Sequence, residues 1–204
     1  MRTNENNMVV LGGEVVEPFK FNHEIYGERF YSTSVRVPRE SGVSDFVPVI
    51  VSERLINVNE DMVGRYVEIA GEFRSYSNRD KDNHKIILSV FPKAIKEVDK
   101  DYYINGIVLD GTICKKKELK KMTSDREMTM LFIAIDRGYK KSDYIPCMLW
   151  GKHAYFAQTL EVGTRIKVTG RIQSRMFVKK FEDGSAENGV AYEVSCSTLH
   201  VLED

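Results

Sequence analysis

The chain has 204 residues, 42% of them hydrophobic, and its 30 Lys and Arg balance 30 Asp and Glu, so that the formal net charge is zero. This length allows one large domain or two small ones, and the zero net charge argues against a protein that binds polyanions over its entire surface. No apolar run approaches the roughly 18 residues of a membrane span, and the first residues, MRTNENN, are too polar for a secretory signal. We therefore expect a soluble, cytoplasmic protein.

The first half of the sequence alternates apolar and polar residues with the two-residue period of strands. The first expected strand bends at Gly12 and Gly13, which would let it serve two sheet edges. Residues 53–62 are expected to form a short helix or an irregular crossover, and the charged stretch SNRDKDN forms a hairpin tip. The expected strands cover residues 8–16 with a continuation at 19–25, then 30–37, 45–51, 66–76 and 85–90.

The second half repeats this order, with expected strands at residues 106–114, 128–136, 144–150, 165–177 and 191–197 and a helix around 153–160. The two halves also match residue by residue. NNMVVLGGEVV from Asn6 aligns with INGIVLDGTIC from Ile104, and DFVPV from Asp45 aligns with DYIPC from Asp143, both at a spacing of 98 residues (143 − 45). After one inserted residue the spacing is 99, and it matches Gly64 with Gly163 and Gly71 with Gly170.

The chain is therefore interpreted as two copies of one unit, residues 1–98 and 104–204, joined by the charged junction KEVDKDYY. Five strands with a helix between the third and the fourth is the order of the OB fold, a partly open barrel. We predict an all-β protein with short helices that forms two tandem five-stranded OB-fold barrels.

The stretch DYIPCMLWGK, from Asp143 to Lys152, should form a strand with two different faces. We expect Ile145, Cys147 and Leu149 to enter a core. The opposite face would then expose a tyrosine, a methionine and the only tryptophan beside basic residues, an arrangement that suits stacked bases with phosphates alongside. These residues are Tyr144, Met148, Trp150, Lys152, Arg165, Lys167, Arg171 and Arg175.

Three stretches of the second unit, IDRGYKKSDYIPCMLWGKHA, LEVGTRIKVTGRIQSRMF and AYEVSCSTLHVLE, resemble the bacterial single-stranded DNA-binding proteins over most of residues 104–203. The first unit resembles that family more distantly, through NNMVVLGG, DFVPV and VEIAGEF. The resemblance implies binding of single-stranded DNA with little sequence preference, in DNA replication, recombination or repair. It also implies a homodimer, because in the tandem form of the family two chains supply four OB domains.

Carried over by position, the base-stacking aromatics of the family would be Tyr139, Tyr144, Trp150 and Phe177. The loop cations Arg137, Lys140 and Lys141 flank the first of these, and the run of lysines from Lys115 to Lys121 is either a solvated loop or a source of further phosphate contacts. In the first unit Ser52 stands where the second has Trp150, which leaves a poorer stacking surface. The expected nucleic-acid-binding residues are Tyr139, Tyr144, Trp150, Phe177, Arg137, Lys140, Lys141, Lys152, Arg171, Arg175, Phe46 and Tyr76, with Tyr31 as a weaker candidate.

The sequence has no phosphate-binding, zinc-protease or nucleophile-elbow motif, and its four histidines lack metal-ligand spacing. Its three cysteines, Cys114, Cys147 and Cys196, lie in apolar stretches without CxxC spacing, so buried reduced thiols are expected. We expect neither an enzyme nor a cofactor.

Two alternatives stay open. The family usually ends in a flexible tail with an acidic, apolar tip that recruits other proteins, whereas this sequence ends HVLED. The chain could thus be an OB-fold interaction module, such as a primosome or recombination accessory factor, with weak binding of nucleic acid; an OB-fold nuclease is a third possibility. For the homodimer, the first strands, Val9–Leu11 and Ile107–Leu109, are expected to pair across a two-fold axis.

Overall fold

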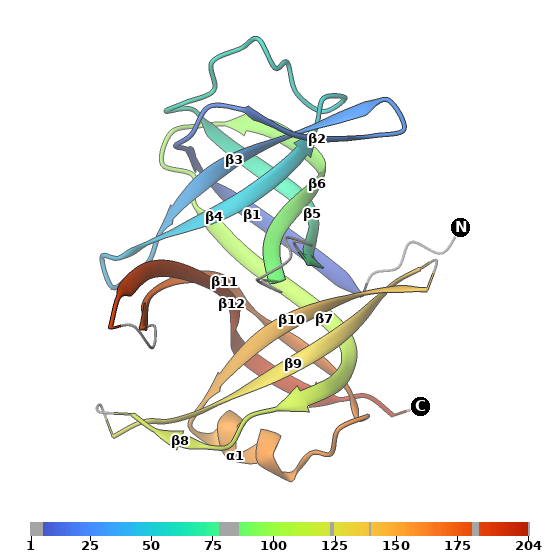
Figure 1. The fold of residues 1–204 in the computed structure, drawn as a ribbon, viewed down its shortest axis with the longest axis vertical. Coiled ribbons are helices and arrows are strands. Elements are labelled where there is room, and N and C mark those ends of the chain that lie inside the picture. Colours follow the sequence, from blue (N-terminus) through green and yellow to red (C-terminus); the bar gives the residue numbers. More distant parts are fainter. Residues whose placement is uncertain (1–5, 78–85, 123–124, 139, 181–183, 204) are drawn as a thin grey trace.

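A computed structural model describes residues 6–77, 86–122, 125–138, 140–180 and 184–203. The first half of the chain forms β1 (Asn7–Val15), β2 (Lys20–Ile25), β3 (Glu28–Pro38), β4 (Ser44–Ser52), β5 (Tyr66–Ser77) and β6 (Ile86–Val98). The second half forms β7 (Ile104–Lys116), β8 (Lys120–Lys121), β9 (Glu127–Gly138), β10 (Lys141–Trp150), α1 (Lys152–Thr159), β11 (Arg165–Lys180) and β12 (Ala186–Val201). The predicted all-β fold with short helices is confirmed, and Figure 1 shows the two halves one above the other.

Each half closes into a barrel with the strand order of an OB fold. In the first barrel β1 pairs with β3, β3 with β4, β4 with β6 in parallel, β6 with β5, and β5 again with β1. The second barrel repeats this circuit with β7, β9, β10, β12 and β11. The helix expected around residues 153–160 is present as α1, whereas residues 53–62 form a series of turns, so the irregular crossover is the correct alternative there.

The two barrels are joined by β1 and β7, which pair antiparallel with Val9 opposite Ile107 and Leu11 opposite Asn105. The strands β6, β5, β1, β7, β11 and β12 therefore form one continuous sheet. The sequence prediction paired these first strands between two chains, and it was wrong in that respect. Since each strand of an antiparallel pair satisfies the backbone groups of the other, the edges that were expected to meet a second chain are already occupied.

Two glycines of the sequence repeat lie where β1 and β7 bend to serve two neighbours. A Cβ atom on Gly13 would lie 2.3 Å from the carbonyl oxygen of Arg36, and one on Gly111 would lie 2.5 Å from that of Ala134. No side chain fits so close to backbone, because real Cβ atoms do not approach within 3.0 Å of another heavy atom. The repeat thus retains glycine at this place in both barrels for a steric reason.

The inward alternation predicted for Asp143–Lys152 is confirmed, since Ile145, Cys147 and Leu149 are completely buried. Complete burial of an isoleucine or leucine side chain contributes about 1.5–3 kcal/mol to the free energy of unfolding. Burial, together with contact with Cys196, also raises the pKa of the Cys147 thiol. All three cysteines are free, but only Cys147 is buried; Cys196 is half-buried and Cys114 is exposed, which corrects the expectation that all of them are buried.

The junction between the barrels is held by its two tyrosines. The hydroxyl of Tyr103 lies 3.3 Å from that of Tyr66 on β5, and this contact, with burial second, raises the pKa of Tyr66 to about 12. Tyr102 donates a hydrogen bond to the carboxylate of Glu68. The Nζ atom of Lys96 lies 2.7 Å from the same carboxylate. The hydrogen bond from Lys96 and then that from Tyr102 lower the pKa of Glu68.

Among the described residues, no helix is long and apolar enough to cross a membrane.

Candidate nucleic-acid interface

The outer surface of β9 and β10 is an apolar face on the second barrel. Its residues face one another across the strand pair, and we call this surface the β9–β10 face. It consists of Met128 opposite Trp150, Met130 opposite Met148, Phe132 opposite Pro146, and Ala134 opposite Tyr144. Tyr144 is 47% exposed, as predicted, whereas Trp150, which was expected to be exposed, is half-buried.

Met148 does not follow the prediction, because only 4% of its surface is exposed. The amide nitrogen of Gln173, on β11, lies 3.8 Å from the sulfur of Met148 and covers it. The alternation of β10 placed Met148 outside the barrel correctly, but β11 comes from a distant part of the sequence and closes over it.

Trp150 lies beside cations and methionines at one end of the β9–β10 face. The guanidinium carbon of Arg126 is 5.5 Å from the centre of the Trp150 ring, a cation–π contact. A pocket of about 370 Å³ opens next to the ring. Its lining includes Lys117, Lys120, Met122, Met128, Met130 and Arg175. This end of the face thus combines an aromatic surface with positive charge, which is the chemistry that stacked nucleotides require.

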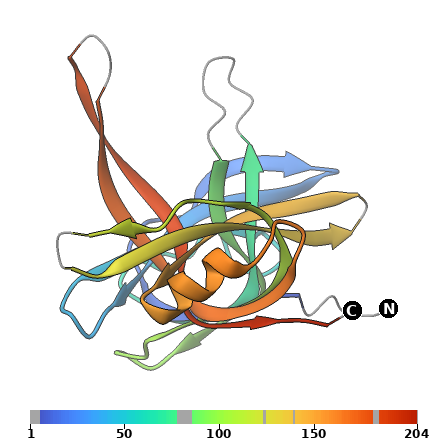
Figure 2. The same cartoon turned by 90° about the horizontal axis from the view of Figure 1, so that it is seen from below.

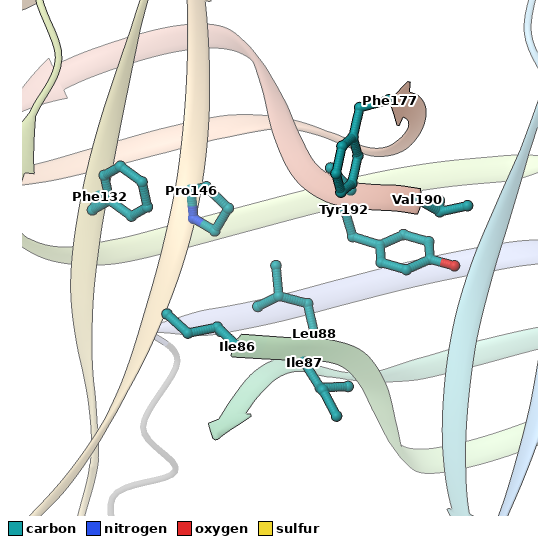
Figure 3. Close-up of a pocket in the computed structure, with 9 residues that line it drawn as sticks. Ile86, Ile87, Leu88, Phe132, Pro146, Phe177, Val190 and Tyr192 are labelled. Carbon is teal, nitrogen blue, oxygen red and sulfur yellow. The ribbon is translucent and has the colours of Figure 1, made fainter. Parts of the chain in front are cut away.

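Phe132, in the middle of the β9–β10 face, was missed by the sequence analysis. The Nζ atoms of Lys115 and Lys117 each lie 5.9 Å from the centre of its ring, so part of the lysine run borders the face. Phe132 also lines a cleft of about 570 Å³ together with Phe177 (Figure 3). The signal was available, because Phe132 has the opposite parity to the buried residues Leu131 and Ile133.

Phe177 lies on β11 directly opposite Gly189 on β12. Its ring covers this glycine so closely that a Cβ atom on Gly189 would lie 2.5 Å from the ring carbon Cζ. Phe177 therefore has a packing role in the hairpin as well as a half-exposed ring beside the cleft.

Several of the predicted cations form ion pairs with buried carboxylates of the chain itself. Arg137 pairs with the buried carboxylate of Asp143 and donates to the carbonyl of Ser75 at 2.9 Å. Arg171 pairs with the buried Asp45 at 3.1 Å, and Arg175 lies 3.5 Å from Glu193. These arginines have structural partners that a phosphate would have to share. Lys140, Lys141 and Lys152 are exposed, and Tyr139 lies outside the described residues.

The buried aspartates form two equivalent contacts between the barrels, which we call the aspartate latches. Asp45, of the first barrel, accepts a hydrogen bond from the backbone N–H of Ser174 at 2.7 Å and binds Arg39. Asp143, of the second barrel, accepts one from the backbone N–H of Ser75 at 2.6 Å and binds Arg137. The sequence repeat aligned the two aspartates but gave no reason for them.

The corresponding face of the first barrel, formed by β3 and β4, is more polar. Phe46 is exposed there, but it lies opposite Arg36, and Ser32 and Ser34 take the positions of Met130 and Phe132. At the end where the second barrel has Trp150, Ser52 donates to Glu28, and His23 stacks on Phe30 at 4.8 Å.

Tyr76, the other aromatic predicted for the first barrel, is half-buried, and burial raises the pKa of its hydroxyl. Tyr144 and Trp150 lie on β10 and Phe177 lies on β11 of the second barrel. Phe46 and Tyr76 belong to the first barrel but lie near the contact between the barrels: the backbone N–H of Phe46 donates to Ser174 Oγ at 3.2 Å, and Tyr76 pairs with Ile87, which lines the same cleft as Phe177. Within the described parts of the chain, no three His, Cys, Asp or Glu side chains form a group that could hold a metal ion.

The family model described as the single-strand binding protein family matches residues 104–202. A single-stranded DNA-binding protein 1 from Streptococcus pyogenes serotype M18 is 30% identical over 107 residues, which are 49% of this chain and 79% of that protein. The chain belongs to this family. A single-stranded DNA-binding protein from Enterococcus faecalis is 29% identical over 107 residues, and the matched part spans about half (55%) of its length.

One solved structure is similar to both barrels of the chain. The crystal structure of the wild-type single-stranded DNA binding protein from Thermus aquaticus has a TM-score of 0.77 and covers 97% of this chain and 93% of its own, at 16% sequence identity. At this identity the match shows the fold alone. It agrees with the two closed barrels and their strand order.

Proposed function

We propose that this member of the single-strand binding protein family binds single-stranded DNA with little sequence preference, in DNA replication, recombination or repair in the bacterial cytoplasm, as a binding protein and not as an enzyme. The observation that carries the proposal is the β9–β10 face, where Tyr144, Phe132 and Trp150 follow one another along two strands with cations beside them.

The chemistry of the face supports binding without sequence preference. Apart from the Tyr144 hydroxyl and the Trp150 indole N–H, its side chains are hydrocarbon or thioether groups without strong hydrogen-bonding atoms. Such a surface can stack on any base but cannot read base edges. The lysines Lys115 and Lys117, which lie along Phe132, would supply charge for phosphates.

Fluorescence titration tests this proposal, because Trp150 is the only tryptophan and lies on the face. Addition of dT oligomers should quench its emission. Tyr144→Ala should weaken binding by about 5- to 150-fold, the equivalent of about 1–3 kcal/mol for one stacked base. Tyr26→Ala is the matched control, since Tyr26 is fully exposed on the hairpin of the first barrel. The proposal fails if poly(dT) leaves the emission unchanged and gives no gel shift at low salt.

The salt dependence separates this function from that of a protein-interaction module. Each phosphate contact on a single strand should lower the logarithm of the binding constant by about 0.7 per tenfold increase in salt. A slope near zero, together with weak binding, would favour the interaction module instead.

We further propose that residues 1–98 and 104–204 are separate domains and that two chains associate through the outer surface of the joined sheet. Met8 and Val10 are exposed on β1, and Met8 lies opposite Val108 on β7. Ion pairs such as Arg165–Asp110 border this apolar centre. Because this apolar patch lies on the approximate two-fold axis between the barrels, the same patch of a second chain can pack against it.

Light scattering tests the dimer. Val10→Glu should reduce the mass to that of one chain, whereas Val43→Glu, at an exposed valine in a loop of the first barrel, should leave the dimer intact. A monomeric mass for the unsubstituted protein would contradict the proposal.

A further inference from the structure

The cleft that Phe132 lines lies between two hairpins that project from the same side of the molecule (Figure 2). We call these the arms, formed by the distal ends of β5–β6 and of β11–β12. Figure 3 shows apolar side chains from both arms around the cleft, with the hydroxyl of Tyr192 as the one side-chain oxygen among those drawn. The arm residues that line the cleft are Ile86, Ile87, Leu88, Phe177, Val190, Ala191 and Tyr192.

The two arms are equivalent parts of the repeat. Ile86 pairs with Ser77, and Val190 pairs with Met176, which follows Ser77 by the 99 residues of the repeat (176 − 77). Ile86 and Val190 are nevertheless both exposed to solvent. Exposed apolar side chains from two arms that line about 570 Å³ of open space form a surface that can bind an apolar partner group.

One end of the cleft is continuous with the β9–β10 face, because Phe132 and Pro146 belong to both. The equivalent residues of the first barrel are Ser34 and Pro48, so the aromatic continuation exists on the second barrel alone. The lysines beside the Phe132 ring lie at this junction. A strand stacked along the β9–β10 face would therefore reach the cleft with its phosphates still near positive charge.

We propose that single-stranded DNA continues from the β9–β10 face into the cleft between the arms, where at least one base packs against both barrels. This inference rests on the proposed function and adds a path to it. The first barrel then contributes through the Ile86–Leu88 edge of its arm and not through its own β3–β4 face. Because the cleft walls offer hydrocarbon in place of hydrogen-bonding partners, the base held there can be of any kind.

Oligomer length provides the test. For the full chain, the affinity for dT oligomers of increasing length should rise in a first step, when the β9–β10 face is covered, and in a second step, when the cleft is reached. Ile86→Asp should leave the first step unchanged and reduce the second step by about fivefold or more, because a carboxylate replaces the hydrocarbon against which the base packs and repels the phosphates. Ile25→Asp is the matched control, because Ile25 is 50% exposed and Ile86 is 47% exposed, both in the first barrel.

Val190→Asp, on the opposite arm, should reproduce the effect of Ile86→Asp. The proposal is overturned if both arm variants keep the full gain with length, or if they change the mass in light scattering without changing DNA affinity, which would make the cleft an interface between copies. If even the short oligomers fail to quench Trp150, it is the proposed function that fails.

Discussion

The aspartate latches should stabilise the contact between the barrels, and Asp45→Asn tests this directly. The Asp45 carboxylate is 1% exposed and binds Arg39, Arg171 and the backbone of Ser174. Replacing it with an amide removes the charge that both guanidinium groups face, and places N–H donors against N–H donors.

The size of the loss can be estimated from these contacts. Breaking a buried ion pair by removing one partner costs about 3–5 kcal/mol. Here the side chains of Arg39 and Arg171 retain 22% and 38% of their exposure, so solvent compensates part of the loss. We expect a decrease of about 3 kcal/mol in the free energy of unfolding, or about 6–12 °C in Tm for a chain of this size.

Urea unfolding followed by circular dichroism measures the effect, with Asp110→Asn as the control. Asp110 forms a more exposed ion pair with Arg165 at 2.9 Å, and pairs of that kind contribute at most about 1 kcal/mol. If Asp45→Asn loses no more stability than Asp110→Asn, the latch contributes nothing beyond a surface ion pair and the argument is refuted.

Three further outcomes are expected. Gly13→Ala should lower Tm by several degrees, because its Cβ would meet a carbonyl oxygen at 2.3 Å, whereas Gly106→Ala, with nothing within 4 Å, should be nearly neutral; equal Tm values would contradict the steric argument. The lowered pKa of Glu68 gives stability that is present above its unfolded pKa of about 4.3 and is lost as the pH falls through its lower folded pKa. The stability difference between wild type and Glu68→Gln in urea should therefore shrink between pH 7 and pH 3, and a constant difference would exclude this linkage. Iodoacetamide should label the exposed Cys114 of the native protein but not Cys147, whose thiol is buried with a raised pKa, and mass spectrometry of the peptides would reveal early Cys147 labelling if this is wrong.

Local alternation and internal repetition were sufficient to predict the strands other than the two-residue β8, the barrel order and the buried side of Asp143–Lys152. A strand with a clear inner face carries that information in its own residues, as Ile145 and Leu149 show. The same reasoning predicted the exposure of Tyr144 and would have found Phe132 had it been applied to β9.

The partners of the charged residues could not be predicted in the same way. Arg171 looked like a phosphate ligand because its neighbours in sequence are basic, yet its partner Asp45 is 126 residues away in the other barrel. The pairing of β1 with β7 and the covering of Met148 by Gln173 are equally non-local. The Arg171–Asp45 pair and the pairing of β1 with β7 depend on how the two barrels dock, whereas the cover on Met148 depends on how β11 lies over β10 within the second barrel. Hydrophobic periodicity encodes neither.

The pairing of β1 with β7 inside one chain also has a consequence for how the molecule can change. In an assembly of identical subunits, every substitution appears at every equivalent position. Here, Trp150 and Ser52 occupy equivalent positions in the repeat and differ. Covalent linkage also makes the contact between the barrels independent of protein concentration. One barrel is thus free to lose aromatic residues while the other keeps them, and the pair remains assembled at any dilution.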